Sequence, residues 1–188
     1  MKKAQVAILP WIFLALATLA CSIFVGGPAY PETPVPVSTE AAGNLDKHIH
    51  TAETAAADSG TLTLTITESQ LTSLVASKLE EQDDPFLTEP QVYLRDGQIQ
   101  IYGKAVRGSL QANIRIVLTA TLDEDGKPVI SVVSTDFGPL PAPEGLNSAI
   151  GDMVDQAFTG AIGPAAVGFR LESISIADGT MTITGRIK

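Results

Sequence analysis

An alternating run over residues 109–122 constrains the fold more than any other feature of the sequence. Apolar residues occupy one parity of this run and polar residues the other, with Val117 as the single exception. Successive side chains of a β-strand point to opposite faces, so the pattern predicts one long strand with a buried face and a wet face. Burial on one side indicates an antiparallel sheet, and we expect the function to reside on its apolar side.

Turn signals and shorter alternating runs predict about seven strands in total. Asp96-Gly97 and Asp178-Gly179 each separate two alternating runs, a strong hairpin signal because both central residues need positive φ. The two hairpins also match each other in sequence, which predicts an internal repeat unless two good hairpin sequences have converged. Further strands are expected at 61–66 and 128–137.

Two amphipathic helices are expected to pack on this sheet. Thr67 and Gln70 form a capping-box pattern directly after the strand at 61–66. Apolar residues then recur at helical spacing: Leu71, Leu74, Val75 and Leu79. A second helix is expected to begin near Glu144 and to end at Gly163-Pro164, with Met153 and Phe158 on its apolar face. These elements define an α+β fold class.

Residues 1–27 have the features of a transmembrane anchor or signal segment. Lys2 and Lys3 precede an uncharged apolar run over 6–25, which as a helix would reach about 30 Å, the thickness of a hydrocarbon core. The positive flank places the rest of the chain outside the cytoplasm. Three interpretations are open: an uncleaved single-pass anchor in the cell membrane, a lipoprotein lipidated at Cys21, and a signal cleaved near Ala29.

The next segment, 28–58, is rich in Pro, Ala and Thr. Such a composition predicts a semi-extended tether that holds a domain of residues 59–188 off the membrane. His48 and His50 lie inside this segment, and without a third ligand nearby they predict no metal site. Their position also leaves the expected domain without histidine, the commonest general base.

The composition argues against several function classes. The chain has 21 acidic and 12 basic residues and a net charge of -9, with no basic cluster outside the extreme N-terminus, which argues against nucleic-acid binding. It contains no nucleophile elbow, Walker loop or dinucleotide-binding fingerprint, and the expected domain has neither His nor Cys. We therefore expect neither an enzyme nor a cofactor.

Several motifs together resemble a known group of bacterial proteins. They are Glu68-Ser69-Gln70-Leu71 after a Thr/Leu strand, the hairpin at Asp96-Gly97, and Gly138-Pro139-Leu140-Pro141 before a helix. With the membrane segment, they look like the YpmS-like membrane-anchored family, and are similar to the LmeA-like phospholipid-binding proteins and, more distantly, to tubular (TULIP-type) lipid-binding folds. The resemblance spans about 61–188. It implies a curved antiparallel sheet that cradles helices and apolar ligands, and it brings no catalytic residue.

These observations predict a membrane-anchored domain that binds a lipid or other apolar ligand on the concave face of its sheet. Seven strands at about 4.8 Å spacing give a sheet roughly 34 Å wide, whereas two helices about 10 Å apart cover only about 20 Å. The candidate lining residues are Leu74, Val75, Leu110, Ile114, Ile116, Leu118, Met153 and Phe158. The alternative is a ligand-free cell-envelope scaffold whose helices fill the sheet and which acts through protein partners.

Overall fold

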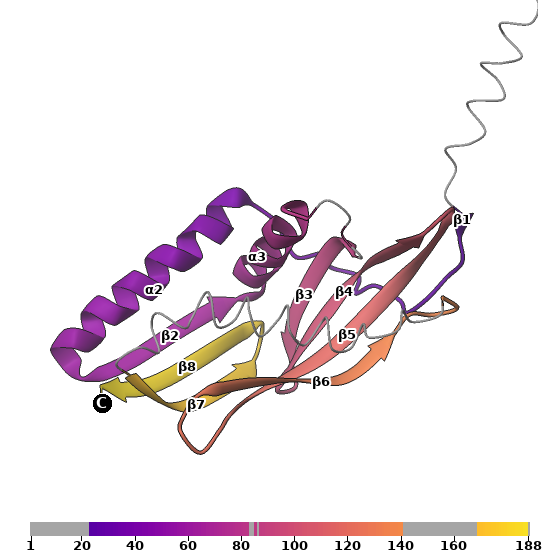
Figure 1. Cartoon of the computed structure of the whole chain (residues 1–188). Helices are drawn as coiled ribbons and strands as arrows, with labels where there is room; N and C mark the ends of the chain where they lie inside the picture. The colour runs from indigo at the N-terminus through magenta and orange to yellow at the C-terminus, as the bar shows by residue number, and fades with distance from the viewer. Residues whose placement is uncertain (1–22, 83–84, 86, 141–168, 188) are drawn as a thin grey trace, which may run out of the picture.

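The computed structural model describes residues 23–82, 85, 87–140 and 169–187 (Figure 1). Within them the chain forms eight strands and two helices, an α+β arrangement as predicted. Their order is β1 (Ile23–Phe24), α2 (Thr39–Ser59), β2 (Thr61–Thr67), α3 (Glu68–Glu80), β3 (Thr88–Arg95), β4 (Gln98–Arg107), β5 (Leu110–Leu122), β6 (Pro128–Asp136), β7 (Phe169–Ala177) and β8 (Thr180–Ile187).

The strands form two sheets rather than one. The five-stranded sheet has the order β1-β5-β4-β3, with β6 paired to β5 as well, and the three-stranded sheet has the order β2-β8-β7. All pairs are antiparallel except β1 with β5. Strand β1 pairs with the first residues of β5, and β6 pairs with its later residues. Both therefore lie along the same edge of β5, the long strand that the sequence predicted.

The predicted hairpins are confirmed, and their turns join the two sheets. Asp96 and Gly97 have φ of 54° and 74°, and Asp178 and Gly179 have φ of 51° and 77°, as a two-residue hairpin turn requires. The Gly97 N–H donates to the Ile176 carbonyl at 3.1 Å, and the Gly179 N–H donates to the Leu94 carbonyl at 3.1 Å. This reciprocal pair relates the two turns symmetrically, and the internal repeat stays a prediction.

Helix α3 covers the edge of β3. Its capping box is present as predicted, with the Thr67 side chain accepting from the Gln70 N–H and the Gln70 side chain accepting from the Thr67 N–H. Glu68 Oε1 accepts from the Leu94 N–H at 2.8 Å, and the buried Thr72 hydroxyl accepts from the Val92 N–H at 2.9 Å. Side chains of α3 thus satisfy backbone groups that an open sheet edge would leave unpaired.

The expected tether is wrong for residues 39–59, which form helix α2. Ser38 caps its N-terminus by accepting from the Ala41 N–H at 3.0 Å, and Gly60 ends it with φ of 74°. Leu45, Ile49 and Ala56 belong to the buried core, and α2 packs on β2 and α3. An alanine-rich helix with so narrow an apolar stripe has a composition close to that of a linker, so composition alone misassigned it.

Residues 28–35, which follow the β1 pairing, lie on the outer face of the five-stranded sheet. Asn113 donates from its N–H to the Gly26 carbonyl at 2.9 Å and from its side chain to the Pro28 carbonyl at 3.2 Å. Val35, Tyr93 and Tyr102 form a small buried cluster there, against which Tyr30 packs. The polar face of the long strand is therefore partly covered by the segment that was expected to be a spacer.

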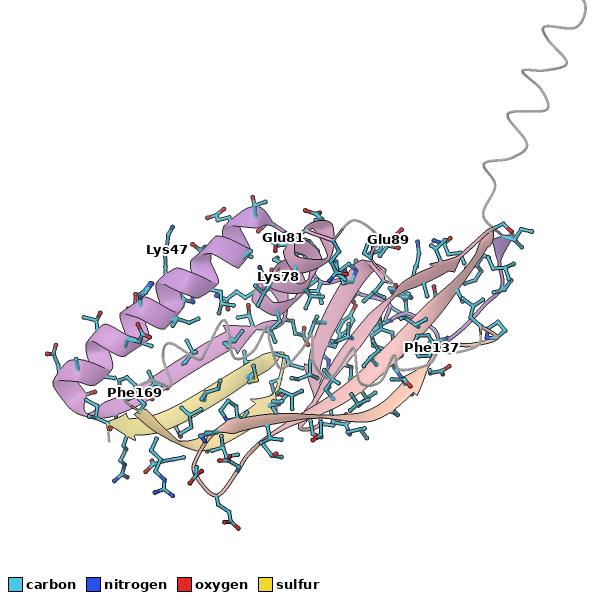
Figure 2. The ribbon with its side chains drawn as sticks, in the orientation of Figure 1. Lys47, Lys78, Glu81, Glu89, Phe137 and Phe169 are labelled. Carbon is cyan, nitrogen blue, oxygen red and sulfur yellow. The ribbon has the colours of Figure 1, made fainter. Side chains whose placement is uncertain are left out.

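The main core lies between the two sheets and the helices, where side chains fill the space between the elements (Figure 2). It includes Ile99 and Ile101 of β4, Ile114 and Ile116 of β5, and Met181 of β8. The predicted parity of β5 holds, because Ala112, Ile114, Ile116 and Leu118 are all at most 1% exposed. Val117, the exception, is also buried on the opposite face.

The predicted anchor and second helix lie outside the described residues, except that the last residues of the apolar run, Ile23 and Phe24, form β1. Among the described residues, no helix has the length and apolar character that a membrane span requires. Cys21, the proposed lipidation site, also lies outside, as do Met153 and Phe158.

Candidate functional site

The predicted lining residues that the structure describes lie in different environments. Ile114, Ile116 and Leu118 are 0%, 1% and 0% exposed and belong to the core, on the face of the five-stranded sheet that packs on it. Leu74 and Val75 of α3 are partly buried and pack against that core. Leu110 lies at the far end of β5 and is 38% exposed. The structure therefore places these residues in three different environments.

Among the described residues, the core-facing side of the five-stranded sheet is less buried toward β6. Four apolar residues there are only partly buried, although they pack against the core: Ala120, Leu122, Ile130 and Val132, which we call the β6 strip. Leu118 pairs with Val132 and Ala120 with Ile130, so the strip continues the inner face of β5 toward the sheet edge. Burial thus decreases from β5 to β6.

The β5–β6 turn fixes one end of this strip. The Asp123 carboxylate accepts from the Asp125 N–H at 2.9 Å and from the Lys127 N–H at 2.7 Å, and Gly126 has φ of 75°. Arg170 of β7 donates to the Glu124 carbonyl at 3.2 Å, so the turn is held against the start of β7. The acidic loop is therefore a tight structural turn.

Alternation along 128–137 predicted a strand, but Ile130 and Val132 were not among the predicted lining residues. Both lie at alternate positions of that strand, which is the signal that places them on one face. Their partial exposure depends on β6 lying at the edge of the sheet, and that is a property of the topology.

A pocket of about 660 Å³ lies between α2, β2 and the start of α3. Leu64, Ala52 and Ala55 contribute its apolar part. Its remaining lining is mostly polar, including Asn44, Thr51, Thr63, Thr65 and a His48 ring nitrogen that is 3.0 Å from Gln70 Nε2. The volume is within the range of small-molecule sites. No group of three or more His, Cys, Asp or Glu in the described residues is arranged to hold a metal.

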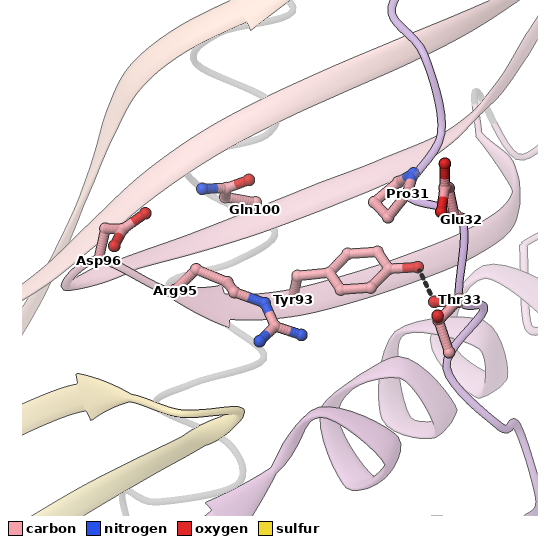
Figure 3. Close-up of a pocket in the computed structure, with 7 residues that line it drawn as sticks. All are labelled: Pro31, Glu32, Thr33, Tyr93, Arg95, Asp96 and Gln100. Carbon is pink, nitrogen blue, oxygen red and sulfur yellow. Dashed lines mark hydrogen bonds between the residues drawn. The ribbon is translucent and has the colours of Figure 1, made fainter.

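A second pocket of about 430 Å³ lies on the outer face of the five-stranded sheet (Figure 3). Tyr93 donates from its hydroxyl to the Thr33 carbonyl at 2.9 Å, and the Arg95 guanidinium lies 5.9 Å from the centre of the Tyr93 ring. Burial, followed by the nearby Glu68, raises the pKa of Tyr93 above its usual value. Glu32, Asp96 and Gln100 complete a lining that suits polar groups rather than an acyl chain.

Comparison with known families identifies the class of protein to which this geometry belongs. Residues 33–186, more than half of the chain, match the family described as LmeA-like phospholipid-binding, and the chain belongs to that family. The match includes α2, in agreement with its place in the core. A comparison with curated proteins finds no match. The likeness to the YpmS-like family is not confirmed.

Proposed function

We propose that this protein binds a phospholipid and that the acyl chains lie along the β6 strip on the concave face. The observation that carries the proposal is that the strip remains partly exposed in a chain whose family is described as phospholipid-binding. Each methylene removed from water contributes roughly 0.8 kcal/mol, so a continuous apolar strip is what an acyl chain requires.

The pocket on the outer face suits an acyl chain less well than the strip does. Carboxylate, guanidinium, amide and hydroxyl groups form much of its lining. Covering such groups with a hydrocarbon chain removes their water without replacing its hydrogen bonds, which costs free energy. Leu74 and Val75 of α3 offer a second apolar surface, on the side of the core where α3 packs on β3.

Attachment to the cell membrane is part of the proposal, with the domain outside the cytoplasm. Lys2 and Lys3 precede the apolar run, and β1 begins at Ile23, so residues 6–22 are available to span. As a helix they would reach about 25 Å, near the lower limit for a bilayer core. The proposed role is binding rather than catalysis, and it requires no cofactor.

Native mass spectrometry of the full chain tests the proposal. The chain is purified in a mild detergent, incubated with phosphatidylethanolamine and phosphatidylglycerol vesicles, and examined for a stoichiometric lipid adduct. The matched variants are Ile130→Gln on the strip and Val129→Gln on the opposite face of the same strand. We expect the adduct in the parent chain and in Val129→Gln, and its loss in a folded Ile130→Gln.

The controls separate the proposal from its alternative. Circular dichroism checks that both variants fold, because a glutamine at a partly buried position also lowers stability. An adduct that persists in folded Ile130→Gln would move the site away from the strip. A parent chain that stays free of lipid would favour the ligand-free envelope scaffold that acts through protein partners.

A further inference from the structure

One end of the five-stranded sheet carries exposed apolar side chains on both of its faces. Ile23 and Phe24 of β1 are 58% and 57% exposed, and Val106 and Leu110, on either side of the β4–β5 turn, are 51% and 38% exposed. Ile23 pairs with Leu110, while Phe24 and Val106 both pair with Gln111. Each pair therefore shares one face, and the two pairs lie on opposite faces. We call these four residues the β4–β5 tip.

The tip does not have the pattern of an ordinary strand end. A strand that packs on a core has one apolar and one polar face, and a turn that meets water is polar on both. Residues that are apolar and exposed on both faces suit an environment that surrounds the end of the sheet. A bilayer interface into which the hairpin end dips provides that environment.

Charge distribution favours an anionic surface for this end. Residues 98–122, which form β4, β5 and their turn, contain Lys104, Arg107 and Arg115 and no acidic residue, in a chain of net charge -9. Residues 1–31 likewise contain two lysines and no acid. Glu89 at the start of β3 forms an ion pair with Lys104 at 2.6 Å, and Asp136 of β6 lies opposite Arg115 in the β5–β6 ladder. Anionic lipids attract such basic segments.

Connectivity places the same end next to the proposed anchor. The Ile23 N–H donates to the Ser109 carbonyl at 2.6 Å and the Val25 N–H to the Gln111 carbonyl at 2.8 Å, so β1 is fixed to the tip. The apolar run that begins at residue 6 continues directly into β1, with no intervening spacer. A chain held in the membrane up to residue 22, by a span or by lipid on Cys21, therefore leaves the tip at the bilayer surface.

We propose that the β4–β5 tip inserts into the interface of an anionic bilayer and holds the domain end-on against the membrane. This inference rests on the proposed membrane attachment. It adds a specific docking surface and an orientation, because the long axis of β5 then points away from the membrane. The other end of the five-stranded sheet, where the two Asp-Gly turns meet, is consequently remote from the membrane, and the three-stranded sheet lies beyond it (Figure 1).

Depth-dependent fluorescence on the full chain tests the insertion. In a Cys21→Ser background, which leaves no other thiol in the chain, Val106→Cys carries a nitrobenzoxadiazole label. Val133→Cys is the matched control, since Val133 on β6 is 53% exposed and Val106 51%. The proteins are reconstituted into vesicles of phosphatidylcholine with phosphatidylglycerol, and flotation confirms their attachment. We expect a blue-shifted emission, quenched by doxyl lipid, at position 106 and a water-like emission at position 133.

Two results would overturn the inference. Water-like emission at both positions, on vesicles that carry the protein, would show that the tip does not insert. A shift at position 106 that is equally large in pure phosphatidylcholine would contradict the preference for anionic lipid. The lipid-adduct measurement is independent of this test. If the tip does not insert but the lipid adduct is still observed, the proposed function is unaffected. Failure of the parent chain, with Cys21 intact, to float would contradict membrane attachment and insertion together.

Discussion

The turns at the two ends of β4 have similar lengths but opposite surroundings. The β3–β4 turn at Asp96-Gly97 exchanges hydrogen bonds with the β7–β8 turn, and Glu68 of α3 accepts from the adjacent Leu94 N–H. The β4–β5 turn at Gly108-Ser109 is exposed and is flanked by exposed Val106 and Leu110. The first end is therefore closed by the fold, and the second is free to contact something else.

This difference shows how one hairpin can serve stability and interaction at different ends. Hydrogen bonds at the closed end satisfy polar groups of both turns and of the β3 edge, so changes there should alter the free energy of unfolding. Apolar side chains at the open tip are already exposed, so changes there should leave stability almost unaltered. Substitutions at the middle and at each end can test this contrast.

The largest effect is expected from Ile114→Asp, because Ile114 lies between the two ends and is 0% exposed. An unpaired carboxylate in that core costs several kcal/mol, enough to unfold a domain of typical stability. Circular dichroism and a thermal melt of the variant would report the loss of structure. A folded variant would show that the core around β5 can admit water, and that the concave face is open there.

The closed end should respond strongly to Glu68→Ala. The substitution removes the acceptor of the buried Leu94 N–H and the ion pair between Arg95 Nη2 and Glu68 Oε1 at 3.2 Å. We expect a loss of about 1–3 kcal/mol in chemical denaturation, since a buried donor is left unsatisfied. Glu68→Gln keeps an acceptor oxygen and should lose less. Equal losses in both variants would mean that the charge, rather than the acceptor, matters.

The segment that runs from the open end across the outer face should give a pH-dependent effect. Burial, followed by the nearby Glu89, raises the pKa of Tyr30 above its usual value near 10. Above about pH 10 the unfolded chain loses this proton while the folded chain keeps it, so the free energy of unfolding falls as pH rises. Below that pH the contribution is fully present.

Tyr30→Phe removes this titration, so its stability should decline less steeply than that of the parent between pH 9 and pH 11. The Tyr30 hydroxyl is buried and has no hydrogen-bond partner in the described part of the chain. At neutral pH we therefore expect the variant to be as stable as the parent or slightly more stable. Denaturation at several pH values measures both effects, and parallel alkaline declines would contradict the assignment to Tyr30.

The smallest effect on stability is expected at the tip. Val106→Ser removes an apolar side chain that is already half exposed, and the free energy of unfolding should change by no more than about 0.5 kcal/mol. Val133→Ser provides the reference for an exposed valine elsewhere in the same sheet. A markedly larger loss in Val106→Ser would show that the tip is held by contacts within the chain rather than left free for a membrane.

For much of the candidate site, the sequence predicted which way a side chain points but not whether that side chain is exposed. The parity of β5 identified Ile114, Ile116 and Leu118 correctly as inward-pointing, yet all three proved to be core. Ile130 and Val132 carry the same alternation and remain partly exposed because their strand lies at an edge. Periodicity reports which way a side chain points, whereas exposure depends on what packs against it.

Local chemistry in the sequence alone determined the turns, the strand parity and the start of α3, because Asp-Gly pairs, alternation and a capping box act over a few residues. Tertiary structure alone decided that α2 joins the core, that the strands divide into two sheets, and that the β4–β5 tip stays uncovered. These outcomes depend on which surfaces meet across the chain. The free energy of burial comes from the packing of two surfaces against each other, so it cannot be predicted from one segment alone.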